Sequence, residues 1–286
     1  MFFSTGFLKD WWRLTRAEHA FLTTFAVITA EVIVAKRFSP SFLIPAIAPF
    51  FIVLGSFVLN DYLGFKSDEA NKRFDRPLVA GRIERVHALY AAALFFVLGV
   101  AALFLVNETA FAIGLTFTIL SMLYDSFLKR VPLAGNAFIA SSMSIAFVYG
   151  NVALSNSLSN LNFFVLAFAL MAFTSGLGRE LLITLRDVKG DRKAGMLTLP
   201  MLLGTRKTVV FATALIYFAV AASFLPLLQV FFVPYVVLVI LADVFWLVAT
   251  KIVFFETGAQ VFKRARDYSL YALVFGLLAF ASLVFS

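Results

Sequence analysis

The sequence predicts an all-helical, polytopic membrane protein, and three observations support this fold class. Hydrophobic residues make up 62% of the 286 residues and charged residues only 14%, whereas soluble proteins are about half apolar and about a quarter charged. Several apolar runs are long enough to cross a bilayer, which needs about 20 mainly apolar residues. These runs lack the strict alternation of polar and apolar residues that is typical of transmembrane β-strands, so we expect helices.

Nine predicted spans follow one another along the chain. The first is preceded by the polar segment FLKDWWRLTRAEH, and no short basic segment with a small-residue cleavage site opens the sequence, so we expect no removable signal peptide. The connections on the outer side are short, whereas two connections on the inner side are long. The spans cover residues 19–35, 41–62, 87–106, 109–127, 133–153, 161–182, 208–228, 231–250 and 268–285.

The distribution of basic residues predicts the orientation. With the N-terminus inside, all but Lys36 and Arg37 of the 24 lysines and arginines fall in inner segments. Cytoplasmic loops carry an excess of Lys and Arg, so we expect a multi-pass protein of the cell membrane with a cytoplasmic N-terminus and an outer C-terminus. The net charge of +8 is then a topology signal and does not imply binding to nucleic acid. The absence of cysteine excludes disulfides, thiolate catalysis and Cys-ligated metals.

The long inner connections, at about residues 63–86 and 183–207, carry acids as well as bases. In the first, Asn60, Gly64 and Asp68 stand at i, i+4 and i+8, which is one stripe on a continuing helix, with Asp61 one position round. In the second, Asp187 and Asp191 stand at i and i+4, two turns after Arg179 and Glu180. The two acidic stripes therefore leave the membrane on the same side.

Paired carboxylates at two helix ends are typical of a magnesium site. Mg2+ takes oxygen ligands and is commonly held by one or two carboxylates plus the phosphates of a substrate. Two such clusters that face each other would bind a diphosphate through bridging Mg2+, and nearby Lys and Arg side chains would hold phosphate oxygens. The alternative for either cluster is that its acids are solvated or pair with neighbouring bases.

The same motifs resemble those of a known family. The run NDYLGFKSD, residues 60–68, resembles the NDxxDxxxD signature of the UbiA-type intramembrane prenyltransferase superfamily, and DVKGD, residues 187–191, looks like its second DxxxD motif. The order and spacing of the motifs and the nine-helix layout agree over nearly the whole chain. We therefore expect residues 1–286 to form a single membrane-embedded domain with motif one at 60–77 and motif two at 179–200. Further matches are LTR ending at Arg16, DRPL from Asp75, GRI from Gly81, YDSFLKR from Tyr124, and TLP from Thr198.

The resemblance implies an Mg2+-dependent enzyme that transfers an isoprenyl group from an isoprenyl diphosphate, for example geranylgeranyl diphosphate, to a lipophilic acceptor and releases diphosphate. It also implies a central cavity beneath a cytoplasmic polar cap, open sideways to membrane lipids, and no obligatory protein partner. The acceptor is either an archaeal glyceryl ether phosphate or an aromatic quinone precursor, and the NDY and DRPL elements look slightly closer to the archaeal lipid branch.

The resemblance also assigns roles to individual positions, with two departures from the family pattern. Gly64 stands where the family has its middle acid, so Asp61 is expected to replace that ligand, and Thr184 stands where many members carry a further Asp. Gly64 also weakens a helix by about 1 kcal/mol relative to Ala, so the stripe is expected to bend there. The expected metal ligands are Asn60, Asp61, Asp68, Asp187 and Asp191. The expected diphosphate ligands are Asn60, Arg16, Arg76, Tyr124 and Lys129. The expected catalytic residues are Asp68, Asp187, Asp191 and Lys129.

Two other classes stay open. A membrane transporter usually places its ionisable residues near the bilayer midplane, whereas the acids here cluster at one edge. A catalytically weakened homologue that binds prenyl diphosphate is the second alternative, because Gly64 replaces an acid.

Three polar residues in the predicted spans have separate expectations. Glu31 lies about one turn from Lys36 and Arg37, which favours an ion pair at the outer surface. Asp243 lies deeper and either faces the cavity or bonds a neighbouring helix. His19, one turn after Arg16, either assists as a base toward the acceptor or makes a structural polar contact.

Overall fold

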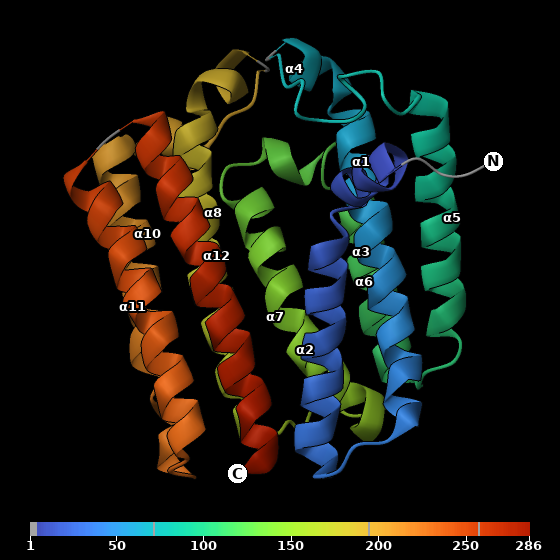
Figure 1. The fold of residues 1–286 in the computed structure, drawn as a ribbon, viewed down its shortest axis with the longest axis vertical. Coiled ribbons are helices and arrows are strands. Elements are labelled where there is room, and N and C mark those ends of the chain that lie inside the picture. Colours follow the sequence, from blue (N-terminus) through green and yellow to red (C-terminus); the bar gives the residue numbers. More distant parts are fainter. Residues whose placement is uncertain (1–4, 71, 194, 257) are drawn as a thin grey trace.

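The protein is a bundle of helices, and no strand occurs in the part of the chain described here (Figure 1). The computed structural model describes residues 5–70, 72–193, 195–256 and 258–286, so Asn71 and Ala194, within the two predicted motifs, lie outside the described residues. Within these ranges eight helices are long and apolar enough to cross a membrane, and a ninth apolar helix, α6, is shorter. The predicted all-helical, multi-pass membrane class is confirmed.

The nine apolar helices correspond one by one to the predicted spans. Short helices join them, mostly at the ends of the bundle. The apolar helices are α2 (Ala17–Ala35), α3 (Leu43–Leu63), α5 (Arg85–Leu103), α6 (Glu108–Leu123), α7 (Ala134–Ser155), α8 (Phe163–Lys193), α10 (Thr205–Ala222), α11 (Val233–Phe255) and α12 (Ala259–Ser282). The short helices are α1 (Thr5–Thr15), η1 (Pro40–Phe42), α4 (Phe65–Ala70), η2 (Leu128–Arg130), α9 (Leu199–Leu203), η3 (Leu225–Leu228) and η4 (Leu283–Phe285).

Two helices extend beyond the predicted spans because their polar turns remain helical. α8 continues through the second acidic motif to Lys193, and α12 begins at Ala259, nine residues before the predicted start at 268. The helix is interrupted at Gly64, where a bend was expected, since α3 ends at Leu63 and α4 begins at Phe65. α4, the end of α8 and the beginning of α2 lie at the same end of the bundle, which we call the polar end, and the C-terminus lies at the opposite end (Figure 1).

The helix α1 was not anticipated from hydropathy, because it is short and mixes apolar with charged residues. It lies near the polar end and connects to α2 through Arg16 (Figure 1). Arg16 has φ 45° and ψ 51°, the left-handed conformation that non-glycine residues rarely adopt. This sharp corner directs the Arg16 side chain toward the end of α3, where its partner Asp61 lies.

Small residues bring neighbouring helices into close contact. A Cβ atom added to Gly150 of α7 would collide with the backbone oxygen of Val27 in α2. A Cβ atom added to Gly178 of α8 would lie 2.8 Å from the backbone oxygen of Ala212 in α10. Glycine permits this approach in membrane helices, where association depends on close van der Waals packing.

Glu31 and Asp243, two of the charged residues inside the spans, differ in their surroundings. The expected ion pair of Glu31 with Lys36 or Arg37 is wrong: Glu31 is fully buried, and neither carboxylate oxygen has a hydrogen-bond partner among the described residues. Its position on α2 faces the bundle interior, which a spacing of one turn in the sequence does not reveal. Asp243 does both things proposed for it, since it lines the central cavity and its Oδ2 accepts a hydrogen bond from Ser223 at 2.8 Å.

Candidate active site

A cavity of about 1320 Å³ occupies the centre of the bundle. Its wall includes Asn136 and Tyr149 of α7, which are separated by about 20 Å along a helix that rises 1.5 Å per residue. The wall is charged at the polar end and largely apolar further in, where it includes Ile113, Phe147 and Phe168. The cavity therefore offers a charged site and a hydrocarbon-lined space within one volume.

Every site residue expected from the sequence lies on the wall of this cavity. They come from the corner before α2, the end of α3, the long connection after it, the segment after α6, and the end of α8. The lining residues among them are Arg16, Asn60, Asp61, Asp68, Arg76, Tyr124, Lys129, Asp187 and Asp191.

Motif one is organised around Asp61 and two arginines. Asp61 is only 3% exposed, and its Oδ1 accepts hydrogen bonds from Arg16 Nη2 at 3.2 Å and from Arg76 Nη1 at 2.6 Å. Arg76 Nη1 also lies 2.9 Å from Asp68 Oδ2. Burial raises the pKa of Asp68, which the charge of Arg76 only partly opposes. The break at Gly64 thus places Asp68 of α4 beside an arginine that Asp61 of α3 also holds.

Motif two lies on one stripe of α8. One face of this helix carries Glu180, Thr184, Asp187 and Asp191, which stand at i, i+4, i+7 and i+11. All four line the cavity. Asp187 makes a bidentate pair with Arg186, at 2.8 and 2.7 Å. The Asp191 carboxylate makes no ion pair within the described residues. Burial, and then the charge of Asp187, raise its pKa to about 6.

Basic side chains connect the two motifs electrostatically. Lys129 lies near enough to lower the pKa of both Asp68 and Asp191, although burial raises each pKa overall. The pKa of Arg73 is raised mainly by its hydrogen bond to Asp75, and the charges of Asp68 and Asp187 add to this effect. One lysine and one arginine therefore interact electrostatically with both motifs, and both motifs line the polar end of the same cavity.

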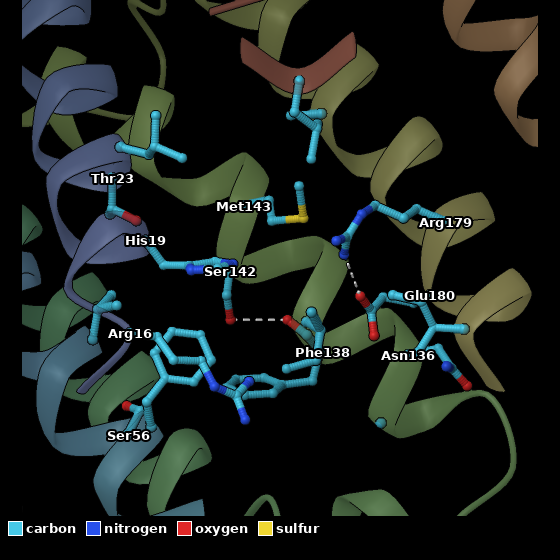
Figure 2. Close-up of a pocket in the computed structure, with 18 of the residues that line it drawn as sticks. Arg16, His19, Thr23, Ser56, Asn136, Phe138, Ser142, Met143, Arg179 and Glu180 are labelled. Carbon is cyan, nitrogen blue, oxygen red and sulfur yellow. Dashed lines mark hydrogen bonds and ion pairs between the residues drawn. The ribbon is translucent and has the colours of Figure 1, made fainter. Parts of the chain in front are cut away.

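A second layer of polar side chains lies further inside the cavity. Arg179 Nη1 lies 3.1 Å from Glu180 Oε1, and its Nε donates to Ser269 at 3.0 Å. His19 lies on the opposite wall, and hydroxyl-bearing residues such as Ser142 lie between the two walls (Figure 2). This layer separates the charged end of the cavity from its apolar part.

Asp125, at the polar end, has a role that was not expected from the sequence, whereas its neighbour Tyr124 was expected as a diphosphate ligand. Asp125 accepts a hydrogen bond from Asn60 at 2.9 Å and lies 3.5 Å from Lys129 Nζ, so it holds a residue of motif one and the lysine together. Its place directly after Tyr124, in the YDSFLKR run, is the signal that would have identified it. Burial, and then the charge of Glu180, raise the pKa of Tyr124, so its phenol keeps a proton to donate.

The donor set fits Mg2+ only together with phosphate. Within the described residues no group of at least three His, Asp or Glu side chains is arranged to hold a metal ion by itself. The acids instead form two small groups, Asp61 with Asp68 and Asp187 with Asp191, and the Asp191 carboxylate has no ion-pair partner among the described residues. Carboxylate oxygens in pairs, with phosphate oxygens completing the shell, are the usual protein site for Mg2+.

Comparison with known proteins relates this cavity to a family. The sequence model of the UbiA prenyltransferase family matches residues 20–274. Digeranylgeranylglyceryl phosphate synthase of Archaeoglobus fulgidus is 30% identical over 280 residues, which cover 96% of this chain and 94% of that protein.

Two solved structures share the fold. A structure described for digeranylgeranylglyceryl phosphate synthase matches with a TM-score of 0.74 and 26% identity, covering 97% of this chain and 98% of that one. A UbiA homolog from Archaeoglobus fulgidus bound to GPP and Mg2+ matches with a TM-score of 0.64 and 18% identity, covering 95% and 99%.

Proposed function

Since this chain belongs to the UbiA prenyltransferase family, we propose that it transfers a geranylgeranyl group from geranylgeranyl diphosphate to the hydroxyl group of a glyceryl ether phosphate. The observation that carries the proposal is that two aspartate motifs and several basic side chains line one end of a cavity whose inner part is largely apolar. The charged end suits the diphosphate, and the apolar part suits the hydrocarbon chain. The name of the Archaeoglobus fulgidus relative supports a glyceryl phosphate acceptor over an aromatic quinone precursor.

The two motifs would hold the diphosphate with Mg2+. Asn60 and Asp68 would act from one side, and Asp187 and Asp191 from the other. Asp61, whose Oδ1 accepts from both Arg16 and Arg76, would contribute through its second oxygen. Bound Mg2+ would neutralise the negative charge that develops on the diphosphate as the carbon–oxygen bond breaks.

Fixed donors at the polar end would bind the phosphate oxygens directly. Lys129, Arg16 and Arg76 carry the positive charge, and Tyr124 supplies a phenolic proton. Because these groups are already oriented by Asp61 and Asp125, they need little rearrangement as charge develops on the leaving group, which is the usual source of electrostatic catalysis.

Aromatic rings line the cavity beside the expected diphosphate ligands Tyr124 and Lys129, and we expect the allylic cation to form near them. Phe138 lies between Phe117 and Tyr124, with ring centroids 6.1 and 5.7 Å from its own. All three residues line the cavity. A cation near an aromatic face is stabilised by about 0.5–2 kcal/mol, and an apolar wall keeps water away from it.

We also propose the finer topology and extent of the protein. The polar end faces the cytoplasm and the C-terminus lies outside, because the inner loops hold all but two of the lysines and arginines. The chain acts as a single membrane-embedded domain, since motif one and motif two line one cavity.

The test is the reaction itself. Purified protein in detergent is supplied with geranylgeranyl diphosphate, Mg2+ and geranylgeranylglyceryl phosphate, and released diphosphate and the ether product are measured. We expect Asp68→Ala and Asp187→Ala each to lower the rate at least about 100-fold, since the loss of metal-assisted charge stabilisation removes several kcal/mol. Chelation of Mg2+ is expected to have the same effect on the unmodified protein.

Matched controls define the outcome. Glu84→Ala, whose side chain is 75% exposed outside the cavity, is expected to keep full activity. An aromatic acid such as 4-hydroxybenzoate serves as the alternative acceptor. Transfer to the aromatic acid alone would contradict the proposed acceptor. Binding of geranylgeranyl diphosphate without any diphosphate release would contradict the enzyme assignment and favour a catalytically weakened homologue or a transporter.

A further inference from the structure

Prenyl transfer to an alcohol releases the proton of the acceptor hydroxyl group, and we propose that His19 accepts this proton. This inference rests on the proposed function, because it concerns the hydroxyl group of the glyceryl ether phosphate. The allylic carbon–oxygen bond breaks and its electron pair leaves with the diphosphate. A lone pair of the acceptor hydroxyl then forms the new carbon–oxygen bond, and the hydroxyl proton passes to a ring nitrogen of His19 and afterwards to water.

His19 lies at the depth where the acceptor hydroxyl is needed. It stands three residues after Arg16 on α2, so it is about one helical turn further from the polar end. It lines the cavity and faces the wall that carries Arg179 and Glu180 (Figure 2). A diphosphate held by Arg16 and Arg76 at the polar end would therefore present its reacting carbon toward the level of His19.

The imidazole ring is held in a fixed orientation with one edge free. Phe57 of α3 packs against it edge-on, with ring centroids 5.1 Å apart, and the same Phe57 ring supports the Arg16 guanidinium at 4.7 Å. His19 Nδ1 is buried with no hydrogen-bond partner in the described part of the chain and lies 3.6 Å from Glu18 Oε1. The side chain is nevertheless 41% exposed, so its other edge, which carries Nε2, is the one open to the cavity.

Three serines and one glutamate that line this part of the cavity are already engaged. The hydroxyls of Ser56, Ser142 and Ser175 each donate to a backbone oxygen of their own helix, at 2.6, 2.9 and 2.7 Å. Their lone pairs can orient a hydroxyl group, but a serine hydroxyl is too weak a base to remove its proton. Glu180 is paired with Arg179 at 3.1 Å. Within the described residues, His19 is the nitrogen base of this layer that has a free edge.

A weak base is sufficient for this step. Once the hydroxyl oxygen has bonded to the allylic carbon, its proton belongs to an oxonium ion, which is a far stronger acid than an imidazolium ion. A neutral imidazole within hydrogen-bond reach therefore removes it readily, and in proteins a positioned base of this kind contributes about 100- to 10,000-fold.

The test measures how much of the allylic cation is captured by the acceptor, as the ether, and how much by water, as the prenyl alcohol. In the complete reaction with Mg2+ and geranylgeranylglyceryl phosphate, the ether and the free prenyl alcohol are quantified for the wild-type protein, His19→Ala and His19→Gln. We expect both variants to form the ether about 100-fold more slowly. Ionisation does not need His19, so water captures more of the cation, and the ratio of prenyl alcohol to ether is expected to rise in both. The affinity for geranylgeranyl diphosphate, measured by calorimetry, is expected to stay unchanged.

The variants separate a base from a merely structural residue. Gln keeps a hydrogen-bonding group near the position of Nε2 but accepts no proton, so a His19→Gln variant as active as the wild type would overturn the inference. An equal fall in ether and prenyl alcohol with unchanged diphosphate binding would also overturn it. The matched control is His87→Ala, the other histidine, whose side chain is 63% exposed at the start of α5. Absence of the ether in the wild-type reaction would instead contradict the proposed function.

Discussion

Asp61 holds two arginines of the polar end with a single carboxylate oxygen. Its place beside the Asn60–Asp68 stripe indicates a metal ligand, and the structure adds that its Oδ1 is shared by Arg16 and Arg76. Arg16 is 45 positions away in the chain, and its left-handed corner brings it to Asp61. Such a pair depends on the tertiary arrangement of α2 and α3, so no local pattern predicts it.

Glu31 is the residue whose change is expected to stabilise the protein. A buried polar group without a partner costs about 1–3 kcal/mol, and both oxygens of this carboxylate lack one among the described residues. We expect Glu31→Met, which keeps the length of the side chain and removes the polar atoms, to raise the midpoint of thermal unfolding in detergent by a few degrees.

The matched control for Glu31 is an exposed glutamate. Glu84→Met changes a side chain that is 75% exposed, so its midpoint is expected to stay close to that of the wild type. A lower midpoint for Glu31→Met would show that the carboxylate is bound by a group outside the chain, such as a lipid or an ion.

At the scale of helices, the contact between α2 and α7 depends on one glycine. An alanine at Gly150 would drive its methyl group into the backbone oxygen of Val27, which cannot move without shifting α2. We expect Gly150→Ala to lower the free energy of unfolding by about 1–3 kcal/mol, as overpacking in a tight core does. The measurement is thermal or denaturant unfolding of the purified protein in detergent.

The same substitution at Gly276 of α12 is the control, because nothing lies within 4 Å of a Cβ atom there. Gly276→Ala is expected to leave stability unchanged or raise it by up to about 1 kcal/mol, since alanine is the better helix former. Similar losses at both positions would mean that glycine is needed for helix flexibility and not for close packing.

Hydropathy locates helices well and their ends poorly. The nine apolar runs were found because each must be apolar to lie in lipid, but the polar turns of α8 up to Lys193 carry no such signal. α1 was missed because its 11 residues are too few to span a membrane and include both charges and tryptophans. The site motifs were found by their spacing. That His19 faces Arg179 and Glu180 across the cavity depends on how the helices pack.

At the scale of the whole molecule, the orientation in the membrane is open to a direct test. The chain contains no cysteine, so a single introduced cysteine gives a signal without background. Glu69 lies on α4 at the polar end, and Ser159 lies in the connection between α7 and α8 at the other end, and both are exposed. We expect a membrane-impermeant maleimide to label Ser159→Cys in intact cells and Glu69→Cys only after permeabilisation.

The reverse labelling pattern would place the polar end outside the cell and contradict the positive-inside prediction. Labelling of both positions in intact cells would indicate leaky cells or mixed insertion. A reagent that crosses the membrane serves as the control, because it is expected to label both variants equally.

The change from charged to apolar wall along the cavity has a consequence for the products of the proposed reaction. Diphosphate is soluble in water and would leave past Lys129 and Arg76, while the diether, with two hydrocarbon chains, would dissolve in the bilayer. The two products thus depart into different phases, where each is diluted away from the other. The reverse reaction would require both products to return to the cavity at the same time. The partition of the products between water and lipid therefore drives the synthesis forward.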